Sequence, residues 1–133
     1  MPYRVQLADG LLLTRFEGAI PDTEGLAMVE ELRQTVEGTE GPLVSLSDIT
    51  HLGHAGSIGR RALSDQMRQY SHRVLRTAVC STSIYGRLVA RMVIRDADRA
   101  HFRVFADPET ALQWLEEVKP GVRQTAHRLF EGK

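Results

Sequence analysis

Hydrophobic and polar residues alternate at the start of the chain. Tyr3, Val5 and Leu7 are separated by Arg4 and Gln6, the period-two pattern of a strand with one buried face. An Asp-Gly dipeptide at positions 9 and 10 follows, and both residues tolerate the positive φ angles of a two-residue hairpin turn. Residues 11–16 therefore predict a second strand, antiparallel to the first, which ends near residue 18.

The spacing of apolar residues then changes to that of a helix. Residues 22–37 carry apolar side chains three and four positions apart, and Asp22 or Thr23 can cap the first turn. A short apolar run at residues 43–47 predicts a third strand, in a central position. We expect residues 48–59 to form a loop that leads into a second helix, over residues 56–70.

The second half of the chain continues the alternation of strand and helix. The pattern predicts strands over residues 74–80 and 102–105, with an amphipathic helix over residues 84–93 between them. Asp107, Pro108 and Glu109 form the clearest helix start, because they suit the N-cap, the first helical position and the positive end of the helix dipole. That helix runs to about residue 118.

The order of these elements defines an α/β fold. A strand that follows its neighbour through a helical crossover runs parallel to it. We expect a mixed sheet of four to five strands, opened by a β-hairpin, with about four helices packed on it. Residues 1–119 should form one domain, and residues 120–133 a short C-terminal tail or one more helix.

Composition narrows the class of protein. Hydrophobic residues make up 42% of the chain and charged residues 26%, the balance of a globular domain. Cys80 is the single cysteine, so no internal disulfide or cysteine-based zinc site can form, and we expect it to be a buried strand thiol. No segment has the pattern of a signal peptide or a membrane span, and we expect a cytoplasmic protein.

The formal net charge of zero hides an uneven distribution. Residues 1–59 hold three basic and nine acidic residues, residues 60–103 hold ten arginines and three aspartates, and residues 104–133 hold four basic and five acidic residues. The arginines predict a basic surface made of Arg60, Arg61, Arg87, Arg91 and Arg95. Such a surface suits an acidic protein face, a second copy of this chain or an anionic membrane. Because the surface lacks interleaved aromatic residues, it does not suit nucleic acid. The alternative is that these arginines form a solvated surface, or that they form salt bridges to the acidic first helix.

Polar residues near position 55 are candidates for chemistry. The run Ala-Gly-Ser-Ile-Gly at residues 55–59 is close to the nucleophile elbow of serine hydrolases. A small hydrolase using Ser57 is therefore an alternative, although that core needs a longer chain, and the simpler interpretation is that Ser57 caps a helix. Side chains that could donate to a metal ion occur at His51, His54 and Asp48. The sequence shows no second pair of ligands to complete a site, so we predict no metal. The glycines match neither a P-loop nor a Rossmann motif, and no cofactor is predicted.

Three stretches together resemble the SpoIIAA-like family, which is related to STAS domains and to lipid-binding CRAL-TRIO domains. They are FEG at residues 16–18, LVSLSDITHL at residues 43–52 and VFADPETALQWL at residues 104–115. The resemblance implies a cytoplasmic domain that binds a small lipophilic ligand, a membrane surface or a protein partner, and it does not imply catalysis. In anti-sigma-factor antagonists of this fold a serine after the third strand is phosphorylated; the matching residue here is Ala55, which has no hydroxyl.

These observations define a predicted site and function. Ligands of open α/β sheets bind at the carboxyl ends of the strands, so the rim should include Ser47, Asp48, His51, His54, Ser57, Ser81, Ser83 and Tyr85. For the serines near residue 81, simple helix capping is the alternative. The predicted function is a non-enzymatic domain that binds a small lipophilic ligand or a protein partner. The alternative is a STAS-type regulatory module that acts by partner switching and lacks the usual phospho-serine. Such a module could also form a homodimer.

Overall fold

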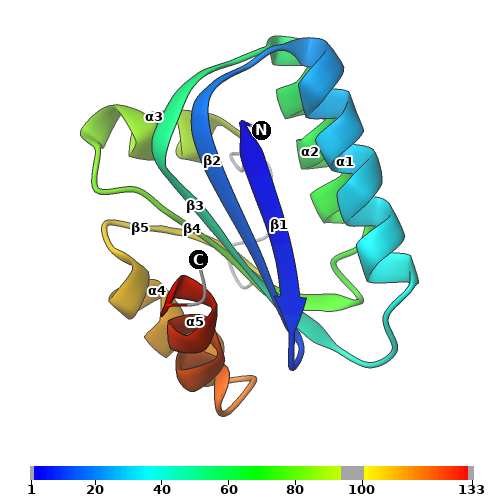
Figure 1. Cartoon of the computed structure of the whole chain (residues 1–133), viewed down its shortest axis with the longest axis vertical. Helices are drawn as coiled ribbons and strands as arrows, with labels where there is room; N and C mark the ends of the chain where they lie inside the picture. Colours follow the sequence, from blue (N-terminus) through cyan, green and yellow to red (C-terminus); the bar gives the residue numbers. More distant parts are fainter. Residues whose placement is uncertain (1, 94–100, 132–133) are drawn as a thin grey trace.

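The computed structural model describes residues 2–93 and 101–131 (Figure 1). Within them, five strands form one sheet in the order β1-β2-β3-β4-β5, with β1 antiparallel to β2 and the other neighbours parallel. The predicted α/β fold with a mixed sheet is confirmed. The elements are β1 (Tyr3–Ala8), β2 (Leu11–Ile20), α1 (Asp22–Glu37), β3 (Leu43–Ala55), α2 (Ser57–Gln69), β4 (Val74–Cys80), α3 (Ile84–Val93), β5 (Phe102–Phe105), α4 (Pro108–Glu116) and α5 (Val122–Glu131).

The opening hairpin forms as predicted. Asp9 and Gly10 have φ angles of 48° and 81°, and two positive φ angles characterise the turn whose twist suits adjacent antiparallel strands. Ala8 and Leu11 are the paired residues on either side of this turn. The hairpin places β1 at one edge of the sheet and β2 beside the central strand.

β3 is much longer than the apolar run predicts. We expected a strand over residues 43–47 and then a loop, but the strand continues to Ala55. Its second half pairs with the second half of β2, whereas β4 ends opposite Asp48. Residues 49–55 have the polar and glycine-rich composition of a loop. They nevertheless form a strand because they pair with β2. Gly53 fits because a β-carbon there would lie 3.2 Å from the backbone of Gly18.

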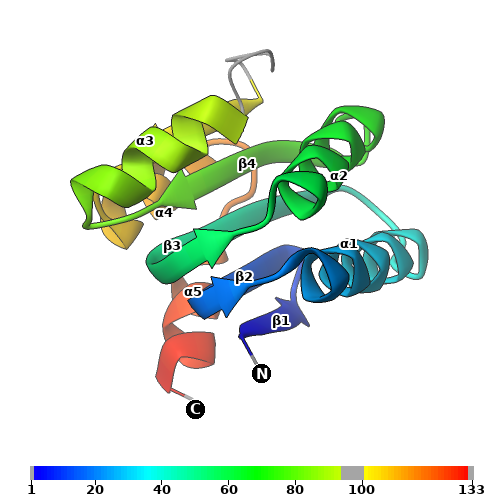
Figure 2. The same ribbon diagram turned by 90° about the horizontal axis from the view of Figure 1, so that it is seen from above.

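Helices cover both faces of the sheet, so the domain has three layers (Figure 2). Side chains of β3 alternate between the faces, as the strand period of two requires. Val44 and Leu46 join the core beneath α4 and α5. Leu43 and Ile49 join the core beneath α1, α2 and α3. Between Leu43 and Ile49, the residues on this second face are Ser45 and Ser47. Both line the cavity described below.

The C-terminal layer follows the predicted capping. Asp107 accepts a hydrogen bond from the backbone N–H of Thr110 at 2.9 Å, and Pro108 lies at the helix start. The segment that we expected to be a tail or a helix forms α5. Its Val122 and Ala126 are buried in the same core as α4. None of the described helices is long and apolar enough to cross a membrane.

Candidate ligand-binding site

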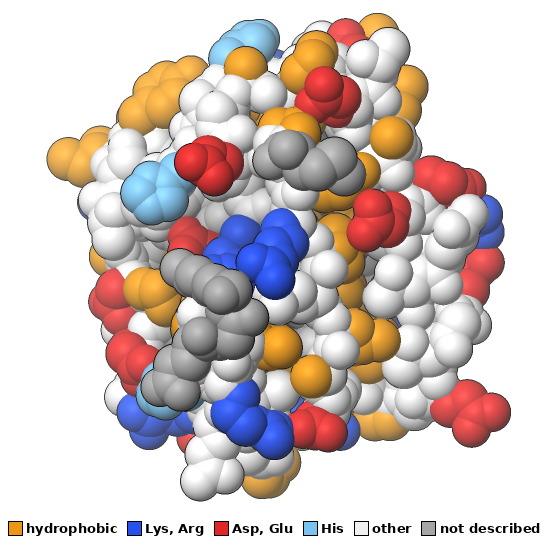
Figure 3. Space-filling view, viewed as in Figure 1, with side chains coloured by type: hydrophobic (Ala, Val, Ile, Leu, Met, Phe, Trp, Pro, Cys, Tyr) orange, Lys and Arg blue, Asp and Glu red, His pale blue; other side chains and the backbone are white. Residues whose placement is uncertain are grey.

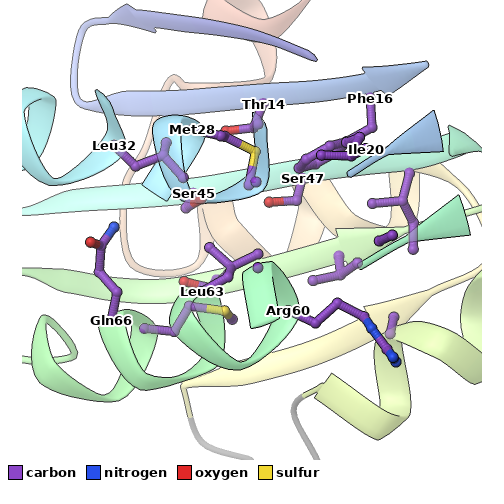
Figure 4. Close-up of a pocket in the computed structure, with 18 of the residues that line it drawn as sticks. Thr14, Phe16, Ile20, Met28, Leu32, Ser45, Ser47, Arg60, Leu63 and Gln66 are labelled. Atoms are coloured by element: carbon purple, nitrogen blue, oxygen red, sulfur yellow. The ribbon is translucent and has the colours of Figure 1, made fainter. Parts of the chain in front are cut away.

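A mostly apolar cavity lies between the sheet and the helices α1, α2 and α3 (Figure 4). Its volume is about 130 Å³, close to the roughly 150 Å³ of an engineered apolar cavity that binds benzene. Strands β2, β3 and β4 form its floor. The apolar side chains around it include Phe16, Met28, Leu32, Ile49, Leu63 and Val79. A small apolar group therefore fits inside this domain without displacing a side chain.

Four hydroxyl side chains cross the floor of the cavity. Thr14 of β2 is paired with Ser47 of β3, and Ser45 of β3 is paired with Thr77 of β4. Thr14, Ser45 and Thr77 are at most 7% exposed, and within the described residues the structure gives their hydroxyls no hydrogen bond. Their oxygen atoms are not among the fully buried atoms that lack a partner, and they face the open space of the cavity. A face that served packing alone would carry aliphatic side chains here, as the opposite face of β3 does.

Two glycines bring α1 and α2 together at one end of the cavity. A β-carbon on Gly25 would lie 3.2 Å from the Cα of Gly59, so neither position tolerates a larger residue without a shift. Asp22 joins the same two helices, because its Oδ1 accepts hydrogen bonds from the backbone N–H groups of Ile58 and Gly59 at 3.1 and 3.2 Å. These contacts determine which face of α2 packs toward the sheet.

Arg60 extends from the first turn of α2 along the cavity (Figure 4). The side chain is half-buried, and its Nε atom is buried without a hydrogen-bond partner. In Figure 4 its guanidinium group lies toward α3, at the opposite end from Gln66. The sequence placed Arg60 on a basic surface, whereas the structure places it against the cavity. This position makes Arg60 the cationic group of the site.

The comparisons with known proteins bear on this arrangement. No family model and no curated protein matches the chain. An uncharacterised protein of the DUF3478 family from Shewanella loihica, described as having a SpoIIAA-like fold, is similar with a TM-score of 0.62 and 19% identity, over 85% of this chain and 91% of that one. The chain has the SpoIIAA-like fold.

Two other solved structures share it. SpoIIAA, an anti-sigma factor antagonist in its unphosphorylated form, has a TM-score of 0.61 and 12% identity, over 89% of this chain and 98% of that one. A serine-to-glutamate variant of RsbS from Moorella thermoacetica has a TM-score of 0.65 and 16% identity, over 86% and 95%. The fold implied by the resemblance in the sequence is thus confirmed. Because one fold can serve many functions, the function has to be inferred from the site.

Of the eight residues predicted for the rim of this SpoIIAA-like domain, Ser47 alone lines the cavity. Asp48 is the next residue along β3, and its side chain lies on the other face of the sheet. There its carboxylate helps to raise the pKa of the buried Cys80 thiol. His51 and His54 are exposed on the extended half of β3. In the described part of the chain, no three His, Cys, Asp or Glu side chains gather where a metal ion could bind.

Ser57 is exposed in the first turn of α2. The interpretation that it caps this helix is wrong, because Gly56 is the N-cap residue and Asp22 of α1 supplies the capping carboxylate. Two histidines downstream are engaged elsewhere: His101 contacts a backbone carbonyl of β4 at 2.9 Å, and His127 contacts a carboxylate of α4 at 2.7 Å. Within the described residues, no histidine is hydrogen-bonded to Ser57, as the general base of a serine hydrolase would be.

Ser81 and Ser83 stabilise the start of α3. The Ser81 Oγ accepts a hydrogen bond from the backbone N–H of Ser83 at 3.0 Å, and the Ser83 Oγ accepts one from Gly86 at 3.4 Å. Their hydroxyls therefore serve the capping role that the sequence offered as the alternative to ligand binding. Tyr85 follows on the outer side of α3, where it is 61% exposed.

The rest of the predicted basic surface is not continuous. Arg61 and Arg91 are exposed. Arg87 donates to the backbone carbonyl of Ser81 at 2.8 Å, which holds it against the chain. Arg95 lies outside the described residues. The arginines of the middle segment thus have different environments rather than one shared face.

Several acidic side chains lie along the side of the molecule that α1 forms (Figure 3). Within this helix, Arg33 forms ion pairs with Glu30 and Glu37 at 2.7 and 2.6 Å. Part of the acidic charge is therefore balanced inside α1 itself and not by the arginines of the middle segment.

Cys80 is buried in β4, as expected. Burial, together with the neighbouring carboxylates of Asp48 and Asp107, raises the pKa of its thiol far above the usual range. A thiol is nucleophilic only when it is deprotonated. Cys80 therefore contributes to packing and is unsuited to act as a nucleophile at neutral pH.

Apart from Ser47, the polar residues of the cavity floor were not singled out from the sequence. A signal was present, since Ser45 and Ser47 take alternate positions in the run of residues 43–47, whose other members are aliphatic. A second signal was the helical spacing that Arg60 shares with Leu63 and Met67, which also line the cavity. Each signal shows that certain residues lie on the same face of a strand or helix. Neither shows what that face packs against.

Proposed function

We propose that this SpoIIAA-like domain is a non-enzymatic protein that binds a small lipophilic ligand in the cavity beneath α1, α2 and α3. The observation that supports it is an apolar cavity of about 130 Å³ with hydroxyl groups on its floor. Ligand sites typically combine apolar walls with a few polar groups that orient the ligand. Within the described residues no histidine is hydrogen-bonded to Ser57, and burial raises the pKa of the Cys80 thiol, so both environments favour binding over catalysis.

Native mass spectrometry of freshly purified protein, followed by lipid extraction, tests for a retained ligand. Titration with hexanol and octanol tests the cavity directly. Ser45→Leu adds aliphatic atoms on the cavity floor and should abolish binding, while Ser57→Leu adds the same atoms on an exposed position and should leave it unchanged. A ligand-free mass combined with no binding of either alcohol to the wild-type protein would contradict the proposal.

A second candidate is a STAS-type regulatory module that binds a protein partner through α3. This helix exposes four large apolar side chains, between 54% and 71% of each: Ile84, Tyr85, Leu88 and Met92. Exposed apolar patches of this kind mark interaction sites, and SpoIIAA, which has a similar structure, is an anti-sigma factor antagonist.

Sedimentation velocity over a wide concentration range, at low and high salt, tests whether the partner is a second copy. Leu88→Glu places a charge in the centre of the exposed face and should abolish any association through α3. A wild-type protein that stays monomeric in every condition contradicts self-association, and an association that survives in Leu88→Glu contradicts the role of α3.

A further inference from the structure

Arg60 differs from the other half-buried arginines that the structure describes. Each of the others donates to an oxygen atom of the protein: Arg15, Arg33, Arg73, Arg76, Arg87 and Arg123. Among the residues that the structure describes, Arg60 has no ion pair and no side-chain hydrogen bond, and its Nε is buried. It is therefore a cation beside an apolar cavity with no counter-charge among the described residues.

The carboxylate at the start of α1 does not supply that charge. Asp22 bonds instead to two backbone N–H groups in the first turn of α2. A partly buried charge without a partner is unfavourable, because the protein replaces only part of the hydration that the charge has lost. An anion that binds at this position would remove that penalty, so the site favours an anionic ligand.

The two halves of the site differ in chemistry. The space beneath α1 and α2 is apolar, and its volume, close to that of the benzene-binding cavity, suits a short alkyl chain. The Arg60 guanidinium lies at one end of the lining residues, toward α3 (Figure 4). A guanidinium is a planar group with five donors, whose geometry matches carboxylate and phosphate oxygens.

We infer that the ligand of this cavity is a short-chain amphiphile with an acidic headgroup, a carboxylate or a phosphate, which Arg60 binds while the alkyl chain fills the cavity. The inference rests on the proposed function, since it assigns the headgroup of a ligand that the cavity must first accept. The floor hydroxyls remain available to water or to a second polar atom of the ligand.

Octanoate, octyl phosphate and octanol are suitable probes, because they share one alkyl chain and differ in the headgroup. Their affinities are measured by NMR titration of the ¹⁵N-labelled protein. We expect at least one acid to bind tenfold or more tightly than octanol, the factor that a single charge-assisted hydrogen bond supplies. Arg60→Met keeps a long apolar side chain and should remove this preference, so that neither acid then binds more tightly than octanol. Arg61→Met, on the exposed neighbouring position, should keep it.

The outcomes separate the two proposals. If octanol binds as tightly as both acids, or if Arg60→Met keeps the preference for the acid, the headgroup assignment is overturned and the lipophilic cavity stands. If none of the three probes binds, the proposed function itself is overturned. A preference between octanoate and octyl phosphate identifies the headgroup. If Arg60→Met fails to fold, the wild-type comparison of acid with alcohol decides the inference, and Arg60→Lys shows whether the planar group is needed.

Discussion

Replacing Thr14 by valine should stabilise the ligand-free protein. Thr14 is 2% exposed on the cavity floor, and its hydroxyl has no hydrogen bond to another described residue. Valine has nearly the same shape, so the substitution removes a polar group without leaving a void. An unsatisfied buried hydroxyl costs about 1–3 kcal/mol. Because the cavity leaves this hydroxyl some contact with open space, we expect a gain at the lower limit, about 1 kcal/mol.

Thr125 provides a matched control on the other side of the sheet. It is 4% exposed in α5, and its hydroxyl donates to the backbone carbonyl of Gly121 at 3.3 Å. Thr125→Val removes a hydroxyl that is bonded, and should lower the free energy of unfolding by about 1 kcal/mol. The same substitution at similar burial should therefore have opposite effects, which differ by about 2 kcal/mol.

Urea unfolding followed by circular dichroism measures both variants against the wild-type protein. A gain of 1 kcal/mol corresponds to a rise of about 4 °C in Tm for a domain of this size. The slope of the transition should not change, since neither variant alters the surface exposed on unfolding. If Thr14→Val destabilises the protein as much as Thr125→Val does, ordered water satisfies the floor hydroxyl and our account of the cavity floor is wrong.

Three further predictions concern contacts outside the cavity. Asp22→Ala removes the cap that α1 provides for α2 and should lower the free energy of unfolding by about 1 kcal/mol in urea; an unchanged midpoint would show that the cap contributes nothing. The Cys80 thiol, whose pKa is raised by burial, should not react with Ellman's reagent at about pH 8 until the protein unfolds; rapid labelling of the folded protein would contradict this. Hydrogen bonds from His127 and Arg123 lower the pKa of Glu109 below its ordinary 4.5, so their contribution to stability is complete above that value and is lost as the pH falls through the lowered pKa. Glu109→Gln should therefore weaken the fall in Tm between about pH 5 and pH 3, and calorimetric curves that stay parallel for the two proteins would refute it.

Much of the fold follows from local patterns. The turn at Asp9 and Gly10 and the helix start at Asp107 could be predicted because each depends on the conformational preferences of a few adjacent residues. The second half of β3 could not. Its residues lack the alternation of a buried strand, and they are extended because they pair with β2, which lies beside them. A pairing between segments about thirty residues apart leaves no local signal.

The candidate site shows the same limit. Ser47 could be placed at the rim because it ends the predicted strand over residues 43–47, and it does line the cavity, although β3 continues past it to Ala55. Ser81 and Ser83 occupy the equivalent position after β4, yet their hydroxyls bond to the start of α3. The sequence pattern is the same at both places, and the difference comes from whether a helix start lies within reach of the hydroxyl.

The sequence by itself determined the order of strands and helices, the mixed sheet and the resemblance to the SpoIIAA-like fold, because periodicity and capping depend on neighbours a few residues apart. Only the tertiary structure decided that a cavity exists. Its floor comes from three strands, and the face of α2 that carries Arg60 turns inward because Gly25 and Gly59 let two helices touch. Whether an arginine is a solvated surface charge or an unpaired cation in a binding site depends on which segments pack around it, and that packing involves the whole chain.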